Sequence, residues 1–585
     1  MMTIYDLKPE INIKGVSNGF SGFVAIAEQL SNAIRAQNKE DIVLAIECYP
    51  GVNYTEIKKD LFPLLSPNMT IFTDDYAYTV EEVQEKIKDV ITEDRVFGVL
   101  SQYTIDQFFH ENSIEKAKKE IKDSSGLTIV YGMGTTVISV PDIIVYADLP
   151  RWEIRCRYRD ENLKNWKTDN ADEDELRKYK RGYFFEWGMA DRLKKKIYNQ
   201  VDYLLDTNKK EQPAMIDGKS YRKALSQVAQ VPFRLVPFFD ASVWGGQWMK
   251  EKFNLDPEVE NYGWAFDGVP EENSIILNFK GTKIEIPAIN AVFAYPDELL
   301  GSKVRWRFGT SFPIRFDYLD TMGGRNLSLQ VHPLVEYAQD TFGIHYTQDE
   351  SYYILEATDN STIYLGVKNN TDKDELVADL RKATSGDFEF PDEKYINVFP
   401  VKKHDHYSIP AGTIHCGGPD TIVLEISATP NNFTFKLWDW GRTGLDGIPR
   451  PVHIDHGEPN ILVERDTDFV LEQLVSSADS KFENLSNQEG IQTEKTGLHE
   501  LEFIETHRHW FSESVVIKTH ESVNMLNLVE GTSVLVESLN GEFDALPINY
   551  GETFIVPESV KKYRITNAGD TNKKTAVIQA FVRNL

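Results

Sequence analysis

The histidines of this sequence are concentrated in its second half, where they could bind a metal or transfer protons. Of the twelve, only His110 precedes position 332, and histidine commonly serves both roles near neutral pH. In NLSLQVHPLVEYA (326–338), Gln330 and His332 alternate with apolar residues, so strand periodicity places both side chains on one face. Two donors spaced in this way on the inner face of a barrel can hold one metal ion.

Two further segments supply donors for the same ion. Glu350 precedes an apolar strand in DESYYIL, and SIPAGTIHCGG places His415 after Pro410 and Gly412 in the spacing P-x-G-x-x-H, which recurs in cupin barrels. A single histidine in a strand is more often a hydrogen-bonded core residue, but the joint pattern favours a metal site. Nitrogen and oxygen donors of this kind suit zinc, with iron, manganese or cobalt as substitutes. The predicted ligands are Gln330, His332, Glu350 and His415.

The elements that must position these residues are mostly short strands. From about residue 231 to the C-terminus, strands alternate with turns rich in Gly, Pro, Asn and Asp, apart from a helical stretch around 372–383. This texture predicts a β-sandwich or barrel. A polar bridge at 467–497 divides this part of the chain, and we predict a metal-binding domain at 231–466 and a C-terminal domain at 467–585.

Residues 1–210 predict a different architecture, an α/β layered domain. DIVLAIECYP (41–50) and the apolar segments within 127–149 look like buried strands, and VEEVQEKIKDVI (80–91) has the apolar spacing of a surface helix. Alternation of this kind predicts a parallel sheet covered by helices. We interpret the charged stretch 151–196 as solvated helices rather than as phosphate-binding arginines, and the polar segment 211–230 as a linker.

A strand–turn–helix in LAIECYPGVNYTEI lies where a nucleotide phosphate loop would be found. Such a loop needs a second glycine, a lysine for the phosphates and a hydroxyl for magnesium. Counted from Gly51, Asn53 occupies the glycine position and Tyr54 the lysine position, and only Thr55 survives. The domain resembles the P-loop nucleoside kinases in layout alone, so we expect a degenerate, inactive P-loop-like domain with a structural or regulatory role.

Positions 231–585 resemble type I mannose-6-phosphate isomerases, which are zinc-dependent cupin enzymes. The matching segments, in the family's order, are VPFFDASVWGGQWM, NLSLQVHP, DESYYIL, IPAGTIHC and FKLWDWGRTGLDGIPRPVH. The resemblance implies a mainly-β cupin (jelly-roll) catalytic domain that binds one Zn²⁺ per chain through the four predicted ligands. It also implies catalytic roles for Lys436, which replaces the family's arginine, and for Arg442, and we expect Ser328 to help hold the substrate phosphate.

The last block of the chain keeps the cupin framework without the metal residues. In YGETFIVPESVKKYRI, Ser559 stands where the framework has glycine and Lys562 where it has the metal-binding histidine. We therefore predict a second, degenerate cupin barrel without a metal ion. The pair His507 and His509 lacks a legible third ligand, and we interpret both as surface residues.

Composition excludes several classes of function. With 63 basic and 91 acidic residues, the formal net charge is −28, which argues against binding to nucleic acid or to anionic membranes. No uncharged apolar run reaches the roughly 18 residues of a membrane helix, and the N-terminus lacks the pattern of a signal peptide. Three cysteines, Cys48, Cys156 and Cys416, suit a reducing compartment. We expect a cytoplasmic protein whose oligomeric state the sequence leaves open.

The predicted activity is the interconversion of mannose 6-phosphate and fructose 6-phosphate through a metal-stabilised cis-enediol(ate). Lysine at position 436 keeps the positive charge of the family's arginine but loses its bidentate fork. Another cupin sugar or sugar-phosphate isomerase therefore remains an alternative. A non-catalytic sensor of sugar phosphates is a second alternative, and Tyr54 disfavours a third, a bifunctional enzyme with an active N-terminal kinase.

Overall fold

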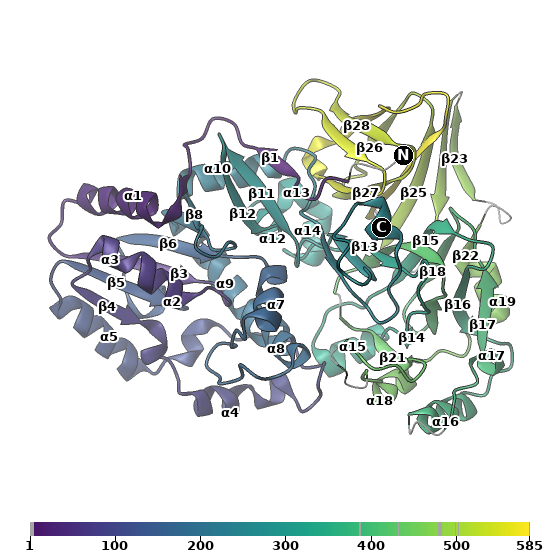
Figure 1. Ribbon diagram of the computed structural model, residues 1–585, viewed down its shortest axis with the longest axis horizontal. Helices are drawn as coiled ribbons and strands as arrows, with labels where there is room; N and C mark the ends of the chain where they lie inside the picture. Colours follow the sequence, from purple (N-terminus) through teal and green to yellow (C-terminus); the bar gives the residue numbers. More distant parts are fainter. Residues whose placement is uncertain are drawn as a thin grey trace.

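The computed structural model describes residues 5–384, 388–430, 432–445, 447, 450–477, 482–488, 490–497, 499–500 and 502–583. These residues form several domains, with an α/β domain at one end of the molecule and two sheet-rich units at the other (Figure 1). Within the described ranges, no helix combines the length and the apolar character needed to cross a membrane.

A seven-stranded sheet in the order β2-β8-β7-β6-β3-β5-β4 organises the α/β domain. Five adjacent strands of this sheet, β7-β6-β3-β5-β4, run parallel, as predicted. Consecutive buried residues in β3 and β6 show that both faces of the sheet are covered. The strands are β2 (Phe20–Ser21), β3 (Ile42–Cys48), β4 (Met69–Phe72), β5 (Leu127–Gly132), β6 (Ile143–Asp148), β7 (Tyr203–Asp206) and β8 (Ala214–Asp217), and the longer helices are α1 (Gly22–Ala36), α4 (Val80–Ile91), α5 (Glu111–Asp123) and α9 (Trp187–Ile197).

The turn after β3 has the predicted strand–turn–helix layout. Gly51 has a positive φ of 99°, and the side chain of Asn53 caps the helix α2 (Tyr54–Asp60) by accepting from the amide of Glu56 at 3.1 Å. Arg157 donates to the carbonyl oxygen of Gly51 at 2.9 Å. This arginine therefore anchors the protein's own backbone, and the relation to P-loop proteins stays a prediction.

The segment 211–230, predicted as a linker, is instead an integral part of the α/β domain. Strand β8 pairs with β7 in an antiparallel register, and helix α10 (Gly218–Val228) follows with the side chain of Asp217 as its N-cap. The three apolar residues 214–216 are buried. The short apolar run was hidden between polar neighbours, but it completes the sheet.

The charged stretch 151–196 forms the predicted helices, but they are not simply solvated. It contains α7 (Arg151–Asp160), α8 (Glu175–Arg181), a π-helical turn at 182–186 and α9. Arg157 and Arg181 are buried and donate to the carbonyl oxygens of Thr207 at 2.6 Å and Trp166 at 3.0 Å. These charges are satisfied by backbone oxygens and by the carboxylates of Glu153 and Glu186 rather than by water.

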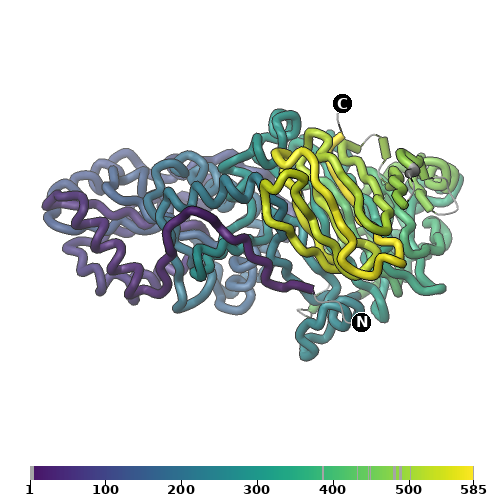
Figure 2. The backbone as a smooth tube through the Cα atoms, turned by 90° about the horizontal axis from the view of Figure 1, so that it is seen from above, coloured from purple at the N-terminus to yellow at the C-terminus, as the bar shows by residue number. Residues whose placement is uncertain are grey.

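Residues 5–21 run as a strap from the C-terminal unit to the α/β domain, which Figure 2 shows as the dark purple tube. The amide of Asp6 donates to Glu552 at 2.7 Å. Further on, β1 (Glu10–Asn12) pairs in parallel with β11 (Ser274–Phe279), which pairs with β12 (Thr282–Pro287). The strap thus contacts elements that follow it by more than 260 residues along the chain.

The middle unit contains two sheets whose buried side chains form one hydrophobic cluster. The seven-stranded sheet has the order β22-β18-β15-β20-β13-β10-β9 and the five-stranded sheet the order β17-β16-β19-β14-β21. The predicted helix around 372–383 is confirmed as α16 (Lys373–Ala383). The strands are β9 (Phe238–Asp240), β10 (Trp264–Gly268), β13 (Ile314–Asp320), β14 (Leu329–Val331), β15 (Glu350–Ala357), β16 (Thr362–Val367), β17 (Ile396–Pro400), β18 (His406–Ile409), β19 (His415–Gly417), β20 (Thr421–Ala428), β21 (Phe435–Trp438) and β22 (Val475–Ser476).

The C-terminal unit also has two sheets, in the orders β23-β24-β25-β32-β27-β30 and β26-β31-β28-β29. The prediction of surface histidines in this unit is wrong, because His507 and His509 on β25 are both buried. His509 contacts Thr493 and Gln579, each at 3.0 Å, and so acts as a hydrogen-bonded core residue. The strands are β23 (Glu483–Gln488), β24 (Ile491–Thr496), β25 (Ile504–Phe511), β26 (Ser514–Lys518), β27 (Asn524–Glu530), β28 (Ser533–Ser538), β29 (Leu546–Asn549), β30 (Thr553–Val556), β31 (Lys562–Asn567) and β32 (Thr575–Val582).

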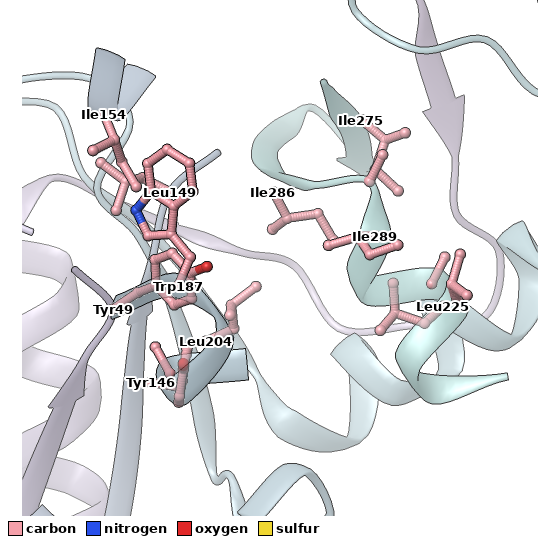
Figure 3. Packing of buried hydrophobic residues seen from close by; sticks show 14 of the residues in the cluster. Tyr49, Tyr146, Leu149, Ile154, Trp187, Leu204, Leu225, Ile275, Ile286 and Ile289 are labelled. Carbon is pink, nitrogen blue, oxygen red and sulfur yellow. The ribbon is translucent and has the colours of Figure 1, made fainter. Parts of the chain in front are cut away.

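One hydrophobic core connects the α/β domain to the sheet-rich units. Figure 3 shows Tyr49, Tyr146 and Trp187 of the α/β domain in the same cluster as Ile275 on β11 and Ile286 on β12. A buried ion pair joins the segment that follows α10 to the C-terminal unit, with Arg234 Nη1 2.8 Å from Glu552 Oε1. The side chains of these two residues are 2% and 0% exposed, so each charge is stabilised by the other in place of water.

Replacing Glu552 with Ala should lower the urea midpoint of unfolding, because it leaves the Arg234 guanidinium buried without its carboxylate. Loss of one partner from a buried pair costs about 3–5 kcal/mol. The matched control is Asp544→Ala, since the pair of Asp544 with Lys14 is exposed and such pairs contribute little. Equal midpoints for the two variants would contradict the importance of the buried pair.

Candidate metal centre

The predicted ligands come together from the two sheets of the middle unit. Gln330 lies on β14 directly opposite His415, the first residue of the neighbouring strand β19, and His332 follows β14. Glu350 is the first residue of β15, in the other sheet. The site therefore joins the two layers of the unit.

A tight turn between β18 and β19 delivers His415 to this position. Gly412 has a φ of 86°, and a Cβ there would lie 2.8 Å from the side chain of Leu462. The amide of Gly412 donates to the carbonyl oxygen of His332 at 3.1 Å. The left-handed conformation and the close approach both require glycine here, which explains the P-x-G-x-x-H spacing.

Glu350 lies between the two histidines. Its Oε2 is 3.0 Å from His332 Nε2, and its Oε1 is 2.8 Å from His415 Nε2. All three side chains are at most 1% exposed. Within the part of the chain that the structure describes, this is the one group of His, Cys, Asp and Glu side chains close enough to hold a metal ion, with ligand atoms within 4.8 Å of one another.

The hydrogen bonds of the two imidazoles prepare them for a metal. His332 Nδ1 lies 3.0 Å from the carbonyl oxygen of Phe433, and His415 Nδ1 lies 2.9 Å from that of Thr413. A carbonyl oxygen can only accept, so both Nδ1 atoms carry a proton, which leaves the two Nε2 atoms as the positions that can bind a metal. Both Nε2 atoms face the oxygens of Glu350, so the carboxylate has positive charge beside it, which either protons on the imidazoles or a metal ion can supply.

The donor set of His332, Glu350 and His415 therefore fits a divalent metal ion. Burial favours the neutral form of Glu350, but His332 and His415 lower the pKa of this carboxyl group well below its ordinary value. The carboxylate form is the one that binds a metal. Gln330 presents its amide nitrogen 3.1 Å from His415 Nε2, so the amide would have to turn for its oxygen to become the fourth ligand.

A cavity of about 310 Å³ opens beside the metal centre. Among its lining residues are Ser328, Gln330, Glu350 and Lys436, so the predicted substrate-binding serine and catalytic lysine do lie together. Lys436 is on β21, opposite Gln330. Burial first, and then the neighbouring positive charge of Arg450, lower the pKa of Lys436 to about 8.

Arg442, whose catalytic role stays a prediction, is not among the residues that line this cavity. Its guanidinium donates to the carbonyl oxygen of Asn326 at 2.6 Å and pairs with Asp439. Two residues that had not been singled out line the cavity instead, Arg450 and His453. Both belong to the motif G-x-P-R-x-x-H, whose arginine and histidine could have identified them.

His453 is held as a neutral hydrogen-bond donor toward the cavity. Its Nδ1 accepts from the backbone amide of Lys436 at 3.3 Å, so the proton is on Nε2. That Nε2 atom is buried and has no hydrogen-bond partner among the described residues. Burial, helped by the positive charge of Lys436, lowers the pKa of His453 to about 3, which keeps the ring neutral.

Comparisons with known proteins divide the chain in two. Residues 22–230 match the family described as Domain of unknown function (DUF8485). The putative mannose-6-phosphate isomerase YvyI of Bacillus subtilis is 25% identical over 343 residues, which cover 58% of this chain and 96% of that protein. The mannose-6-phosphate isomerase of Streptococcus mutans is 27% identical over 217 residues, or 36% of this chain and 62% of that protein.

The crystal structure of the mannose 6-phosphate isomerase from Bacillus subtilis is also similar, with a TM-score of 0.48 and 21% identity over 60% of this chain and 99% of that chain. The chain is thus similar, at low identity, to proteins named as mannose-6-phosphate isomerases. Its α/β segment matches a family of unknown function.

His415→Ala should abolish stoichiometric metal binding, because it removes one of the two imidazoles that face Glu350. The measurement is metal content by mass spectrometry after dialysis of the full-length chain. His507→Ala is the matched control, since His507 is also buried but lies in the C-terminal unit. Full metal content in the His415 variant would contradict the site.

Proposed function

We propose that the protein is a metal-dependent aldose–ketose isomerase that interconverts mannose 6-phosphate and fructose 6-phosphate. The observation that carries this proposal is the convergence of His332, Glu350 and His415 at one buried point beside Lys436, in a cavity. Its volume, about 310 Å³, is in the range of small-ligand sites. The names of the related proteins support the same reaction.

His332, Glu350 and His415, with Gln330 as the fourth donor, would hold the metal, and zinc is the ion we propose. When bound, it would act as a Lewis acid toward the oxygens on carbons 1 and 2 of the open-chain sugar. The backbone hydrogen bonds of the imidazoles keep the ligands in place while substrate enters and leaves.

The remaining cavity residues bind the sugar phosphate and move its proton. Strand β21 places Lys436 beside the metal centre. Its Nζ acts as a general acid or base, donating or accepting a proton during the transfer of hydrogen between carbons 1 and 2. Arg450 and Ser328 offer donors for the phosphate group. Trp244 and Trp264, whose ring centroids are 5.2 Å apart, form an apolar wall that limits access of water.

We also propose that the protein works in the cytoplasm on a free sugar phosphate. Cys48, Cys156 and Cys416 are all free thiols, which suits a reducing compartment. The net charge of −28 does not favour a polyanionic partner.

The central test combines metal content with turnover. The purified full-length chain should convert mannose 6-phosphate to fructose 6-phosphate, lose this activity on treatment with a strong chelator, and regain it with Zn²⁺. A coupled assay for fructose 6-phosphate measures the rate. If the metal-loaded protein binds mannose 6-phosphate without turning it over, the proposed isomerase activity is wrong and a non-catalytic sensor is favoured.

Lys436→Met should reduce kcat by about 100-fold or more, because general acid–base catalysis typically contributes 10²–10⁴-fold. Metal content should stay unchanged, since Lys436 is not a ligand. Lys562→Met, which changes an exposed lysine on β31 of the C-terminal unit, is the control and should keep normal activity. Wild-type turnover in the Lys436 variant would remove this residue from the mechanism.

A further inference from the structure

The cavity beside the metal centre has a second wall that comes from the α/β domain. Helices α7 and α8 lie on the side of that domain that is nearest the middle unit (Figure 1). They fall within residues 22–230, the segment that matches a family of unknown function. The residues of this wall, named here the α/β wall, are Val96, Arg155, Leu176, Tyr179, Tyr183 and Phe184.

Tyr179 connects the α/β wall to the sheet-rich side of the cavity. Its hydroxyl donates to Glu272 Oε1 at 3.0 Å and accepts from Asn432 Nδ2 at 2.9 Å. Both Glu272 and Asn432 also line the cavity. The two walls are therefore held together by polar contacts at the cavity surface itself, so the cavity exists in this form only in the full chain.

Arg155 is held rigidly and retains hydrogen-bonding capacity. Its guanidinium lies over the rings of Trp152 and Tyr179, at 5.3 and 5.2 Å, and such stacking fixes its orientation. It approaches Glu175 at 3.4 Å and Asp240 at 3.8 Å. Its Nε is buried and has no hydrogen-bond partner among the described residues.

Other polar atoms around this part of the cavity are equally unsatisfied. Glu272 Oε2 and Arg315 Nε are buried, and neither finds a hydrogen-bond partner in the described ranges. Both residues line the cavity and are at most 5% exposed. Buried polar atoms are normally paired, so donors and acceptors gathered at one cavity surface indicate a polar ligand.

The charges around Arg155 favour hydroxyl groups over a phosphate. Four arginines lie in this region and face six carboxylates: Arg151, Arg155, Arg159 and Arg315 against Glu175, Asp191, Asp240, Glu272, Asp317 and Glu425. Arg151 contacts Asp191 at 3.0 Å and Glu272 at 3.9 Å. An anion would meet net negative charge here, whereas a hydroxyl group can donate to a carboxylate and accept from a guanidinium.

We propose that the α/β wall recognises the hydroxyl groups on the sugar carbons remote from the metal, and so determines which sugar phosphate the site accepts. Arg155 donates to one hydroxyl, and Glu272, oriented by Tyr179, accepts from another. This inference rests on the proposed function for its substrate class. It gives the domain of unknown function a role as the specificity-determining half of a composite active site.

The test uses Arg155→Ala and Tyr179→Phe in the full-length chain. Each should raise KM for mannose 6-phosphate about tenfold, the usual effect of one lost hydrogen bond, with kcat changed less and metal content unchanged. The selectivity for mannose 6-phosphate over talose 6-phosphate, its epimer at carbon 4, should also change by about tenfold. A merely structural role would not alter the selectivity between epimers.

Two further variants keep the test interpretable. Arg177→Ala on α8 is the matched control, because Arg177 is partly exposed, contacts Asp174 and does not line the cavity. It should show wild-type KM and selectivity. Arg155→Lys keeps the charge without the planar fork and should give an intermediate KM, which separates lost recognition from a failure to fold.

The outcomes separate this inference from the proposed function. If the wild-type chain turns over mannose 6-phosphate and the Arg155 and Tyr179 variants match it in KM and selectivity, the inference is wrong and the isomerase stands. A second outcome is that calorimetry shows the wild type binding mannose 6-phosphate without turnover and Arg155→Ala weakening this binding about tenfold. In that case recognition by the α/β wall is supported and the proposed isomerase activity is wrong. Neither binding nor turnover by the wild type would overturn both.

Discussion

The contact of Glu350 with His332 and His415 is the constraint on which the rest of the site depends. Three side chains that could hold a metal ion are buried at one point, with the Nε2 atoms of the imidazoles 2.8–3.0 Å from the carboxylate oxygens. Such a group is costly in a protein interior unless a cation compensates it. The turn at Gly412 and the backbone acceptors of the two imidazoles hold the arrangement, and because the donors come from both sheets, they also join the two layers of the unit.

The sequence carried enough information to predict the metal centre because its residues follow local rules. Alternation places Gln330 and His332 on one strand face, and the spacing before His415 encodes a turn. The structure brings these residues together with Glu350, while their metal remains a prediction. The helix at 80–91 and the parallel sheet follow from periodicity in the same way.

The features that could not be predicted depend on the path of the chain in three dimensions. Trp440 and Gly441 both have positive φ, and after this bend the guanidinium of Arg442 pairs with Asp439 instead of lining the cavity. No local pattern reports such a bend. The contact of Tyr179 with Asn432 joins residues 253 positions apart, so the second wall of the cavity has no signature in either segment. The prediction of a linker at 211–230 was wrong for a related reason, since three apolar residues suffice to complete a sheet whose other strands lie elsewhere in the chain.

The strap at residues 5–21 has a consequence for folding during synthesis on the ribosome. Strand β1 cannot pair until β11 has been made, and Glu10 and its partner Ile276 are separated by 276 − 10 = 266 residues. At translation rates of roughly 5–20 residues per second, this strand edge waits on the order of 13–53 seconds. The contact of Asp6 with Glu552 must wait until nearly the whole chain has emerged. A nascent chain of this design therefore carries an unpaired leading segment through most of its synthesis, when chaperones that shield extended polypeptide have the longest opportunity to bind it.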